Sequence, residues 1–365
     1  MSFNSIGKIL KLTTWGESHG KEIGGVLDGV PPNLKIDMKF IQEFLDKRAP
    51  GSSKFVTQRK EKDKLEIVSG VFNGYSTGTP IGLIIKNSDS RSKDYSDIKK
   101  KFRPAHADYT YYKKYGIRDY RGGGRSSARE TAMRVAAGSI ARIILGKRID
   151  ITAAVIQLGE KKIKKNNWNK KVISNNFFFC PDKSVLKDWE QYLLNVRKAG
   201  SSCGALIEIR AKGIPVGLGE PIYGKLDAEL AGALMSINAV KGVEIGAGFD
   251  VVKMSGEQNS DEMKVNKDGK ISFLSNNAGG VLGGISSGQD LICRLAVKPT
   301  SSILSKQKTV TVNNKNTTIS TKGRHDPCVG IRCVPVAEAM VALVLADQLL
   351  RDKAQLGKKT RLDEI

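Results

Sequence analysis

The chain has 365 residues, 40% of them hydrophobic, which suffices for one large core or two ordinary ones and excludes a disordered protein. Its formal net charge of +23 is compatible with nucleic acid, a membrane surface or small anionic ligands as partners, and composition does not choose among them. Five scattered cysteines argue against a disulfide framework and favour a reducing compartment, so we expect a cytoplasmic protein.

Membrane insertion is not expected. The N-terminus lacks the basic flank and apolar core of a signal peptide. The most apolar run, 334–350, is interrupted by Glu338 and Asp347 and falls short of the ~20 residues that a membrane span needs.

Residues 6–13 alternate as a strand does and end in Thr14-Trp15-Gly16-Glu17-Ser18-His19-Gly20, after which extended chain resumes at Val26. His19 thus lies between glycines in a tight connection, where its imidazole can approach a ligand and exchange protons near neutral pH. The alternative is a turn histidine bonded to a nearby carbonyl.

Asp37 is placed to cap a helix that ends before Pro50. The helix end and the polar loop behind it carry three basic side chains, Arg48, Lys54 and Arg59. Such a loop either clamps an anion or only keeps the chain soluble.

Residues 65–71 and 79–86 predict a hairpin-like pair of strands. The polar, tyrosine-rich stretch 87–116 follows, with His106 near its centre and a possible helix over 107–115. A loop of this length in a compact protein is usually functional or disordered.

The stretch 118–142 contains three consecutive glycines and then a capping-box pattern, Ser127 followed by Glu130, which predicts a helix from Ala128 to Gly146. A helix N-terminus attracts anions. Three basic side chains oppose the helix dipole at this end and would be offset by a bound anion: Arg125, Arg129 and Arg134. The alternative is a glycine hinge before a solvated basic helix.

The rest of the chain alternates further elements, with strands expected over 149–158, 205–211, 243–245 and 291–297 and helices over 181–200 and 225–236. Residues 298–302 form either a turn whose donors suit phosphate or an ordinary Pro-Ser loop. A hairpin is expected around 313–316, and a long apolar helix from Pro335 to about Arg351.

The order strand, proline-containing link, aspartate and helix occurs at 24–48 and again at 205–238, which suggests two similar halves. We expect one domain over 1–365 with halves near 1–200 and 201–350 and a flexible tail over 351–365.

All three histidines, His19, His106 and His325, lie in connections marked by glycine or proline, and none lies on an apolar periodic face. That coincidence favours a shared site. Cys328 and Cys333 follow His325, but their spacing matches no familiar zinc pattern, so we expect no metal. The dinucleotide-binding pattern G-x-G-x-x-G and the P-loop pattern are absent from the sequence.

Four passages together resemble the chorismate synthase family, in the family's order and over residues 8 to about 350. They are Gly16-Glu17-Ser18-His19-Gly20 with Asp28-Gly29-Val30-Pro31, Arg103-Pro104-Ala105-His106-Ala107-Asp108, Gly124-Arg125-Ser126-Ser127-Ala128-Arg129-Glu130-Thr131, and Arg324-His325-Asp326-Pro327-Cys328. The resemblance implies an α+β fold, a β-α-β sandwich in which two antiparallel sheets flank central helices. It further implies two pseudo-similar halves and assembly as a homotetramer.

The resemblance also implies the activity of a lyase in the shikimate pathway to aromatic amino acids. The reaction is a 1,4-anti elimination of phosphate from 5-enolpyruvylshikimate 3-phosphate to give chorismate, and it requires reduced FMN without a net redox change. With no evident extra domain, the chain resembles the monofunctional bacterial type. Reduced flavin would then be supplied from outside, ultimately by NAD(P)H.

The resemblance assigns roles position by position. His106 would protonate or stabilise the reduced flavin, and His19 would donate a proton near the leaving phosphate. Asp326, with Ser18 and Ser127, would manage the proton on the flavin's central-ring nitrogen. The flavin contacts would be Arg125, Ser126, Ser127, Asn238, Ala239, Ala278, Lys298, Pro299, Thr300, Ser301, Ser302 and Arg324.

The same resemblance gives the residues for the substrate's anionic groups or for NADP, namely Arg48, Lys54, Arg129, Arg134 and Arg332. Lys54 departs from the arginine that the family pattern often has, and lysine does not make a bidentate contact.

Two other functions stay open from the residues alone. A nucleic-acid-binding protein would combine the +23 charge with stacking aromatics such as Tyr109 and Tyr112, and its binding would fall steeply with salt. A phosphate-ester enzyme without flavin would bind no FMN. We expect neither nucleic acid nor a membrane as a partner.

Overall fold

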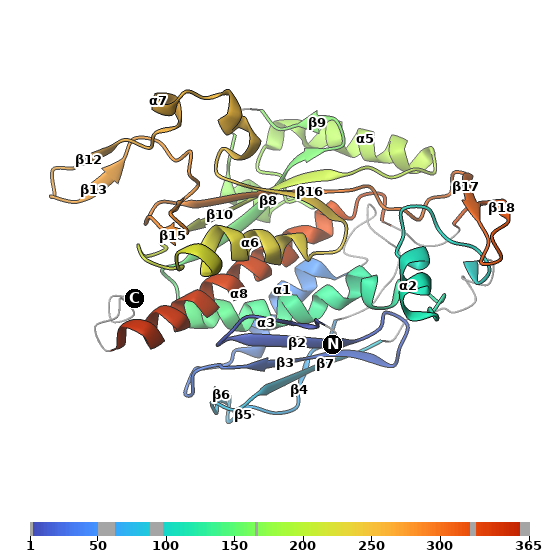
Figure 1. Ribbon diagram of the computed structural model, residues 1–365, viewed down its shortest axis with the longest axis horizontal. Coiled ribbons are helices and arrows are strands. Elements are labelled where there is room, and N and C mark those ends of the chain that lie inside the picture. Colours follow the sequence, from blue (N-terminus) through green and yellow to red (C-terminus); the bar gives the residue numbers. More distant parts are fainter. Residues whose placement is uncertain (1–2, 50–62, 88–97, 165–166, 322–325, 358–365) are drawn as a thin grey trace.

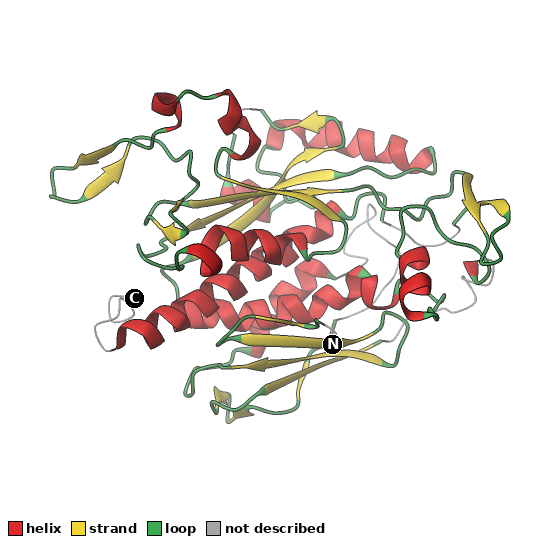
Figure 2. Cartoon of the chain, viewed as in Figure 1, coloured by secondary structure: helices red, strands yellow, loops and turns green. Residues whose placement is uncertain are grey.

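Two antiparallel sheets enclose a layer of helices in the computed structural model, which describes residues 3–49, 63–87, 98–164, 167–321 and 326–357 (Figures 1 and 2). The N-terminal sheet has the strand order β1 (Ser5–Ile6), β2 (Lys11–Gly16), β3 (Glu22–Asp28), β7 (Ile81–Lys86) and β4 (Glu66–Ile67). The C-terminal sheet has the order β11 (Val240–Ile245), β16 (Leu291–Val297), β10 (Ala205–Lys212), β8 (Asp150–Leu158) and β9 (Lys161–Lys162). The expected β-α-β sandwich is confirmed.

The layer between the sheets contains the helices α1 (Met38–Arg48), α3 (Thr131–Leu145), α6 (Leu226–Met235) and α8 (Gly330–Leu356). Outside it lie α2 (Asp108–Tyr115), α4 (Lys170–Ser174) and α5 (Leu186–Lys198). Three of the four short hairpins in the described residues are β5 (Val71–Phe72) with β6 (Tyr75–Ser76), β14 (Val281–Leu282) with β15 (Ile285–Ser286), and β17 (Gln307–Val310) with β18 (Asn316–Ile319). The predicted N-cap of α1 is confirmed, because the Asp37 carboxylate accepts from the backbone N–H groups of Lys39 and Phe40.

The strand predicted over 6–13 is wrong in its middle, where the chain turns between β1 and β2. The cause is a carboxylate from the other end of the chain. Asp347 Oδ1 on α8 accepts from the backbone N–H groups of Lys8, Ile9 and Leu10 at 3.1, 2.8 and 2.8 Å. Three consecutive donors on one oxygen require a turn, not a strand.

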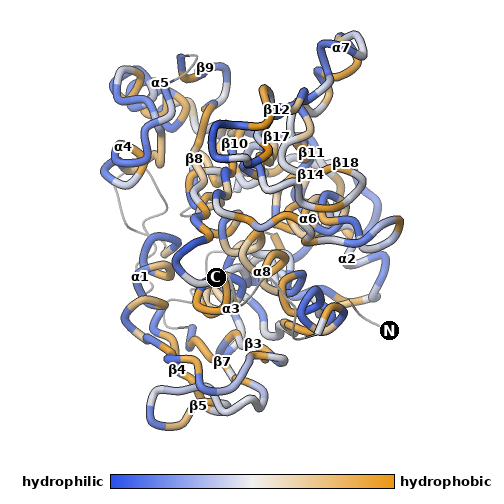
Figure 3. The backbone as a smooth tube through the Cα atoms, turned by 90° about the vertical axis from the view of Figure 1, so that its left-hand side faces the viewer, coloured by the Kyte–Doolittle hydropathy of each residue, from blue (hydrophilic) through white to orange (hydrophobic). Residues whose placement is uncertain are grey.

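The central helix α8 is hydrophobic and buried along most of its length (Figure 3). It begins at Gly330, so the predicted start at Pro335 is wrong, because buried Ile331 and Val334 extend its apolar surface in front of the proline. Among the described helices, α8 alone is long and apolar enough to cross a membrane, yet 89% of its apolar window is buried inside the protein. It is the core helix of the sandwich. Its last turns occupy residues that we expected in a flexible tail, and 358–365 lie outside the described residues.

The two sheets repeat one arrangement of elements. In the first, β3 is followed by α1, the β5–β6 hairpin and β7; in the second, β10 is followed by α6, the β14–β15 hairpin and β16. A serine closes each copy in the same way. Ser76 Oγ donates to Pro31 O and accepts from Leu34 N, and Ser286 Oγ donates to Pro215 O and accepts from Leu218 N. The expected boundary between the two halves, near residue 200, stays a proposal. The sheets divide the chain earlier, because β8 already belongs to the C-terminal sheet.

One excursion leaves the C-terminal sheet and projects from the sandwich (Figure 1). This arm, residues 247–278, carries α7 (Gly256–Asn259) and the hairpin of β12 (Met263–Val265) and β13 (Ile271–Phe273). Its ends meet at β16, where Gly246 N donates to Ile292 O and Ile292 N donates to Gly279 O. The arm therefore leaves and returns at one point of the sheet.

We expect Gly138→Ala to lower the free energy of unfolding by about 1–3 kcal/mol, because close packing of α3 on α8 leaves no room for a side chain. The added Cβ would lie 2.5 Å from Ala339 Cβ and 2.8 Å from Ala339 O. Gly232→Ala on α6 is the matched control, because its Cβ meets nothing within 4 Å. That change should raise stability by up to roughly 1 kcal/mol. Chemical denaturation followed by circular dichroism measures both, and wild-type stability in Gly138→Ala would contradict the packing.

Candidate active site

The described residues of the four passages singled out in the sequence meet at the end of the helical layer nearest α2 (Figure 1). The first and third passages are joined by Ser18 N, which donates to Gly124 O at 3.4 Å. The second joins them through Arg103, whose Nη2 donates to Gly122 O at 2.8 Å. The fourth reaches the third through two arginines. Asp326 pairs with Arg332 at 2.8 Å, Arg332 donates to Arg48 O at 3.2 Å, and Arg48 Nη1 donates to Ala128 O at 3.2 Å.

The ring of His19 packs against the backbone at Gly122, where there is no room for a side chain on residue 122. A Cβ on Gly122, whose φ is +145°, would lie 2.4 Å from His19 Nδ1. Ser18 Oγ and His19 Nδ1 are 2.9 Å apart, and both side chains are buried. The glycine stretch thus lets the His19 ring contact the backbone, and the Ser18 hydroxyl orients it through Nδ1.

The helix start differs from the prediction. Ser127 Oγ accepts from Arg129 N at 3.3 Å and caps a 3-10 turn over Ala128–Glu130, after which α3 begins at Thr131. The predicted capping box is wrong, because the Glu130 carboxylate does not return to Ser127. It accepts instead from Thr14 Oγ1 at 3.0 Å and from Arg134 Nε at 3.0 Å. Two competing donors therefore draw Glu130 away from the helix end. The predicted end at Gly146 is confirmed.

Several expected flavin contacts adjoin one another. Asn238 Nδ2 donates to Ser126 O at 2.9 Å, and Ala239 O accepts from Lys298 N at 2.9 Å. Thr300 Oγ1 donates to Asp326 O at 2.9 Å, which links the 298–302 turn to the fourth passage. Asn238 Oδ1 is buried and has no hydrogen-bond partner in the described part of the chain. An orphaned acceptor here fits a bound ligand that offers N–H groups.

Other expected contacts are engaged elsewhere or fall outside the description. The Arg125 guanidinium donates to Thr14 O, Thr14 Oγ1 and Gly16 O, so it is held on β2. Ala278 lies on the arm at the opposite end of β11 from Ala239, and its N–H donates to Asp261. Lys54, Arg324 and His325 lie outside the described residues.

His106 faces a carboxylate for which we predicted no role. Its Nδ1 lies 3.1 Å from Asp108 Oδ1, and the same carboxylate pairs with Arg103 at 2.7 Å and Arg118 at 2.9 Å. Burial lowers the pKa of His106 below its ordinary value, against the opposing effect of Asp108. Burial alone would raise the pKa of Asp108, but Arg103 and His106 hold it far below its usual range. The position of Asp108 only two residues after His106 was the signal in the sequence that could have predicted this contact.

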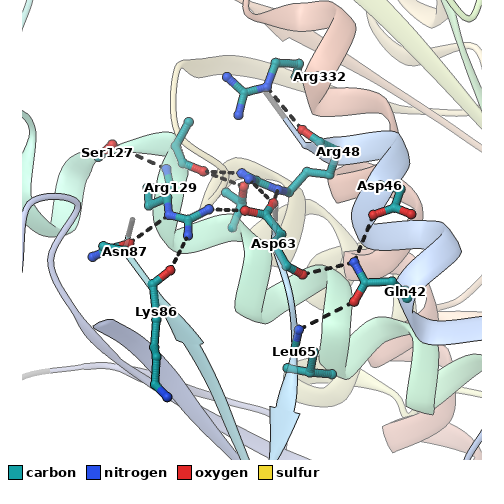
Figure 4. A network of polar contacts seen from close by, with 12 residues as sticks. Gln42, Asp46, Arg48, Asp63, Leu65, Lys86, Asn87, Ser127, Arg129 and Arg332 are labelled. Carbon is teal, nitrogen blue, oxygen red and sulfur yellow. Dashed lines mark hydrogen bonds and ion pairs between the residues drawn. The ribbon is translucent and has the colours of Figure 1, made fainter. Parts of the chain in front are cut away.

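Three of the four expected substrate arginines, Arg48, Arg129 and Arg332, lie close to a second unforeseen carboxylate, that of Asp63 (Figure 4). Both Arg48 and Arg129 pair with Asp63, and all three side chains are buried. Burial, assisted by the neighbouring cations Arg332 and Arg129, lowers the pKa of Arg48 to about 10. Burial alone would raise the pKa of Asp63, but the two arginines hold it below its ordinary value. We call Arg48, Asp63, Arg129, Asp326 and Arg332 the arginine cluster.

Arg134 lies apart from the arginine cluster. Its guanidinium pairs with Glu130 at 3.0 Å and donates to Ser236 Oγ at 2.7 Å. Among the described residues, no group of three or more His, Cys, Asp or Glu side chains is arranged to hold a metal ion.

The buried His106 gives a pH-dependent stability. Its folded pKa lies below the unfolded value of about 6.5, so the unfolded chain takes up the proton more readily and stability falls as pH drops below that value. We expect wild type to lose more stability than His106→Gln between pH 7.5 and 5.5, by at most about 1.4 kcal/mol per pH unit. Urea denaturation at both pH values measures the difference. Equal losses in the two proteins would contradict the assignment.

Comparison with known proteins places this chain in a family. A family model described as chorismate synthase matches residues 10–350. The chorismate synthase of Pelagibacter ubique is 64% identical over 359 residues, 97% of this chain and 99% of that protein, and that of Parvibaculum lavamentivorans is 62% identical over 99% of this chain and 100% of that protein. A crystal structure of chorismate synthase matches with a TM-score of 0.75 at 31% identity, over 96% of this chain and 94% of that one. The chain therefore belongs to the chorismate synthase family of carbon-oxygen lyases that act on phosphates.

Proposed function

We propose that this chain releases phosphate from 5-enolpyruvylshikimate 3-phosphate to give chorismate, and that it does so with reduced FMN. The observation that supports the proposal is the convergence of two oriented histidines and the arginine cluster at one end of the helical layer. A substrate with one phosphate and two carboxylates needs fixed cations around it, and a departing phosphate needs a proton or a guanidinium.

His19 is the proposed proton donor to the leaving phosphate. The Ser18 hydroxyl orients its ring at Nδ1, and Gly122 lets the backbone lie against it. His106, whose Nδ1 faces the Asp108 carboxylate at 3.1 Å, is the proposed partner of the flavin. Burial lowers its pKa while Asp108 opposes that effect, so a further anion beside the ring would favour its protonated form. Asp326 with Ser127 completes the proposed proton-handling set.

The residues fit a bound flavin on one side of the site. The proposed contacts are Arg125, Ser126, Ser127, Asn238, Ala239, Lys298, Pro299, Thr300, Ser301, Ser302 and Arg324. The orphaned Asn238 Oδ1 offers an acceptor there, and the 298–302 turn offers hydroxyl and amide donors. Ala278 lies too far along β11 to join this set within one chain. The reduced flavin would supply electron density without a net redox change, and its reductant, ultimately NAD(P)H, would be supplied from outside.

The proposed assembly is a homotetramer in the cytoplasm, without nucleic acid or a membrane as partner. Its support is apolar surface on the arm, where Phe249, Val252, Met263, Val265 and Ile271 are 65–81% exposed. Exposed apolar patches of this kind mark association surfaces. Light scattering coupled to gel filtration measures the assembly, and a monomer at micromolar concentration would contradict it.

We expect His19→Ala and His106→Ala each to lower turnover by roughly two orders of magnitude, because each removes a positioned proton-transfer group. The assay is anaerobic incubation with 5-enolpyruvylshikimate 3-phosphate and chemically reduced FMN, with chorismate and phosphate measured. Near-normal rates in both variants would remove the assignments. Phosphate release by the wild type without flavin would favour a phosphate-ester enzyme instead.

A further inference from the structure

Asp63 is the member of the arginine cluster to which sequence reasoning gave no role. Its side chain is completely buried, and its two oxygens bind two different guanidiniums (Figure 4). Oδ2 accepts from Arg48 Nε at 3.0 Å and from Arg48 Nη2, while Oδ1 accepts from Arg129 Nη1. One carboxylate therefore sets the distance between two basic groups.

The backbone of Asp63 is fixed by the helix that carries Arg48. Gln42 Nε2 on α1 donates to Asp63 O at 3.1 Å, and Arg48 is the last residue of the same helix. The helix thus places both the guanidinium and the carboxylate that orients it.

Both guanidiniums have additional contacts that stop them from rotating about Asp63. Arg48 Nη1 donates to Ala128 O at 3.2 Å, and Arg129 Nε donates to Asn87 Oδ1 at 2.9 Å. A planar guanidinium held at two or more of its nitrogens has a fixed orientation. The pair is therefore arranged before any anion arrives.

The charges of the arginine cluster favour an anion. Two buried guanidiniums repel each other and carry a desolvation cost, which the shared carboxylate offsets. Arg332 and Asp326 add one charge of each sign, so three guanidiniums face two carboxylates. One excess positive charge is left, which a phosphate or carboxylate of a ligand neutralises.

We infer that Asp63 is a positioning residue, which holds Arg48 and Arg129 at the spacing at which they receive the anionic groups of the substrate. The inference rests on the proposed function, because it takes these arginines as substrate contacts. It adds a residue that itself repels the substrate and acts only through the two cations that it holds.

The test compares Asp63→Asn and Asp63→Glu with the control Asp188→Asn, which removes an exposed carboxylate 3.6 Å from Lys161. The full enzyme is assayed anaerobically with reduced FMN for KM and kcat, and calorimetric titration with 5-enolpyruvylshikimate 3-phosphate gives a Kd without turnover. We expect KM and Kd to rise about tenfold or more in Asp63→Asn, with a smaller change in kcat, because the guanidiniums lose their spacing. Asp63→Glu, which keeps the charge but moves it by one methylene, should also raise both. Asp188→Asn should match the wild type.

A role limited to charge balance gives different results. Removing a negative charge from a cationic cluster would then tighten anion binding, and Asp63→Glu would restore wild-type values. Either outcome overturns the inference. Should Asp63→Asn fail to fold, Asp63→Glu decides alone, and wild-type KM and Kd in it overturn the inference. If the wild type binds the substrate but releases no phosphate, the proposed function fails while the Kd values still decide the role of Asp63.

Discussion

Buried or half-buried carboxylates hold most of the arginines of the candidate site in place. Asp63 binds Arg48 and Arg129, Asp108 binds Arg103 and Arg118, and Asp326 binds Arg332. An unpaired guanidinium in such a dry place would cost several kcal/mol, so the pairs are a condition for burying the cations at all. The same pairs arrange the cations before a ligand arrives. Preorganised charge of this kind stabilises a developing anion without reorganisation during the reaction.

These pairs depend in turn on how the helices meet. Arg48 ends α1, Arg129 lies in the turn before α3, and Arg332 lies in the first turn of α8. The close approach of α3 and α8 at Gly138 and Ala339 keeps those ends together. Packing in the middle of the layer therefore determines the geometry of the site at its end.

Local signals predicted much of the secondary structure, because their causes lie within a few residues. The cap at Asp37, the stop at Gly146 and the strand over 291–297 all depend on near neighbours. The predictions failed where a distant group intervened. Asp347 turns the segment after Ile6, and Thr14 with Arg134 draws Glu130 out of the expected capping box. The arrangement of two antiparallel sheets around central helices was predicted from the family resemblance. Periodicity alone does not specify which strands are neighbours.

For the same reason, the sequence pointed to some residues of the candidate site and not to others. Histidines in connections marked by glycine or proline are conspicuous in a sequence, and His19 and His106 were singled out as candidates that way. Asp63 and Asp108 are ordinary acidic residues there, and only their burial between arginines makes them candidates for the site. Carboxylates that position cations are hard to predict because their partners come from other elements.

The two ends of the arm lie together at the C-terminal sheet, which shows that the sheet does not need the arm in order to close. In the first copy of the repeated arrangement, β4 passes to β5 through residues 68–70, while in the second copy the whole arm, 247–278, occupies the corresponding place. Both ends of the arm bond to Ile292, so the sheet closes across the gap whatever lies between them. The arm is thus a modular insertion, and a change in its exposed apolar side chains would leave the sandwich and the site unaltered.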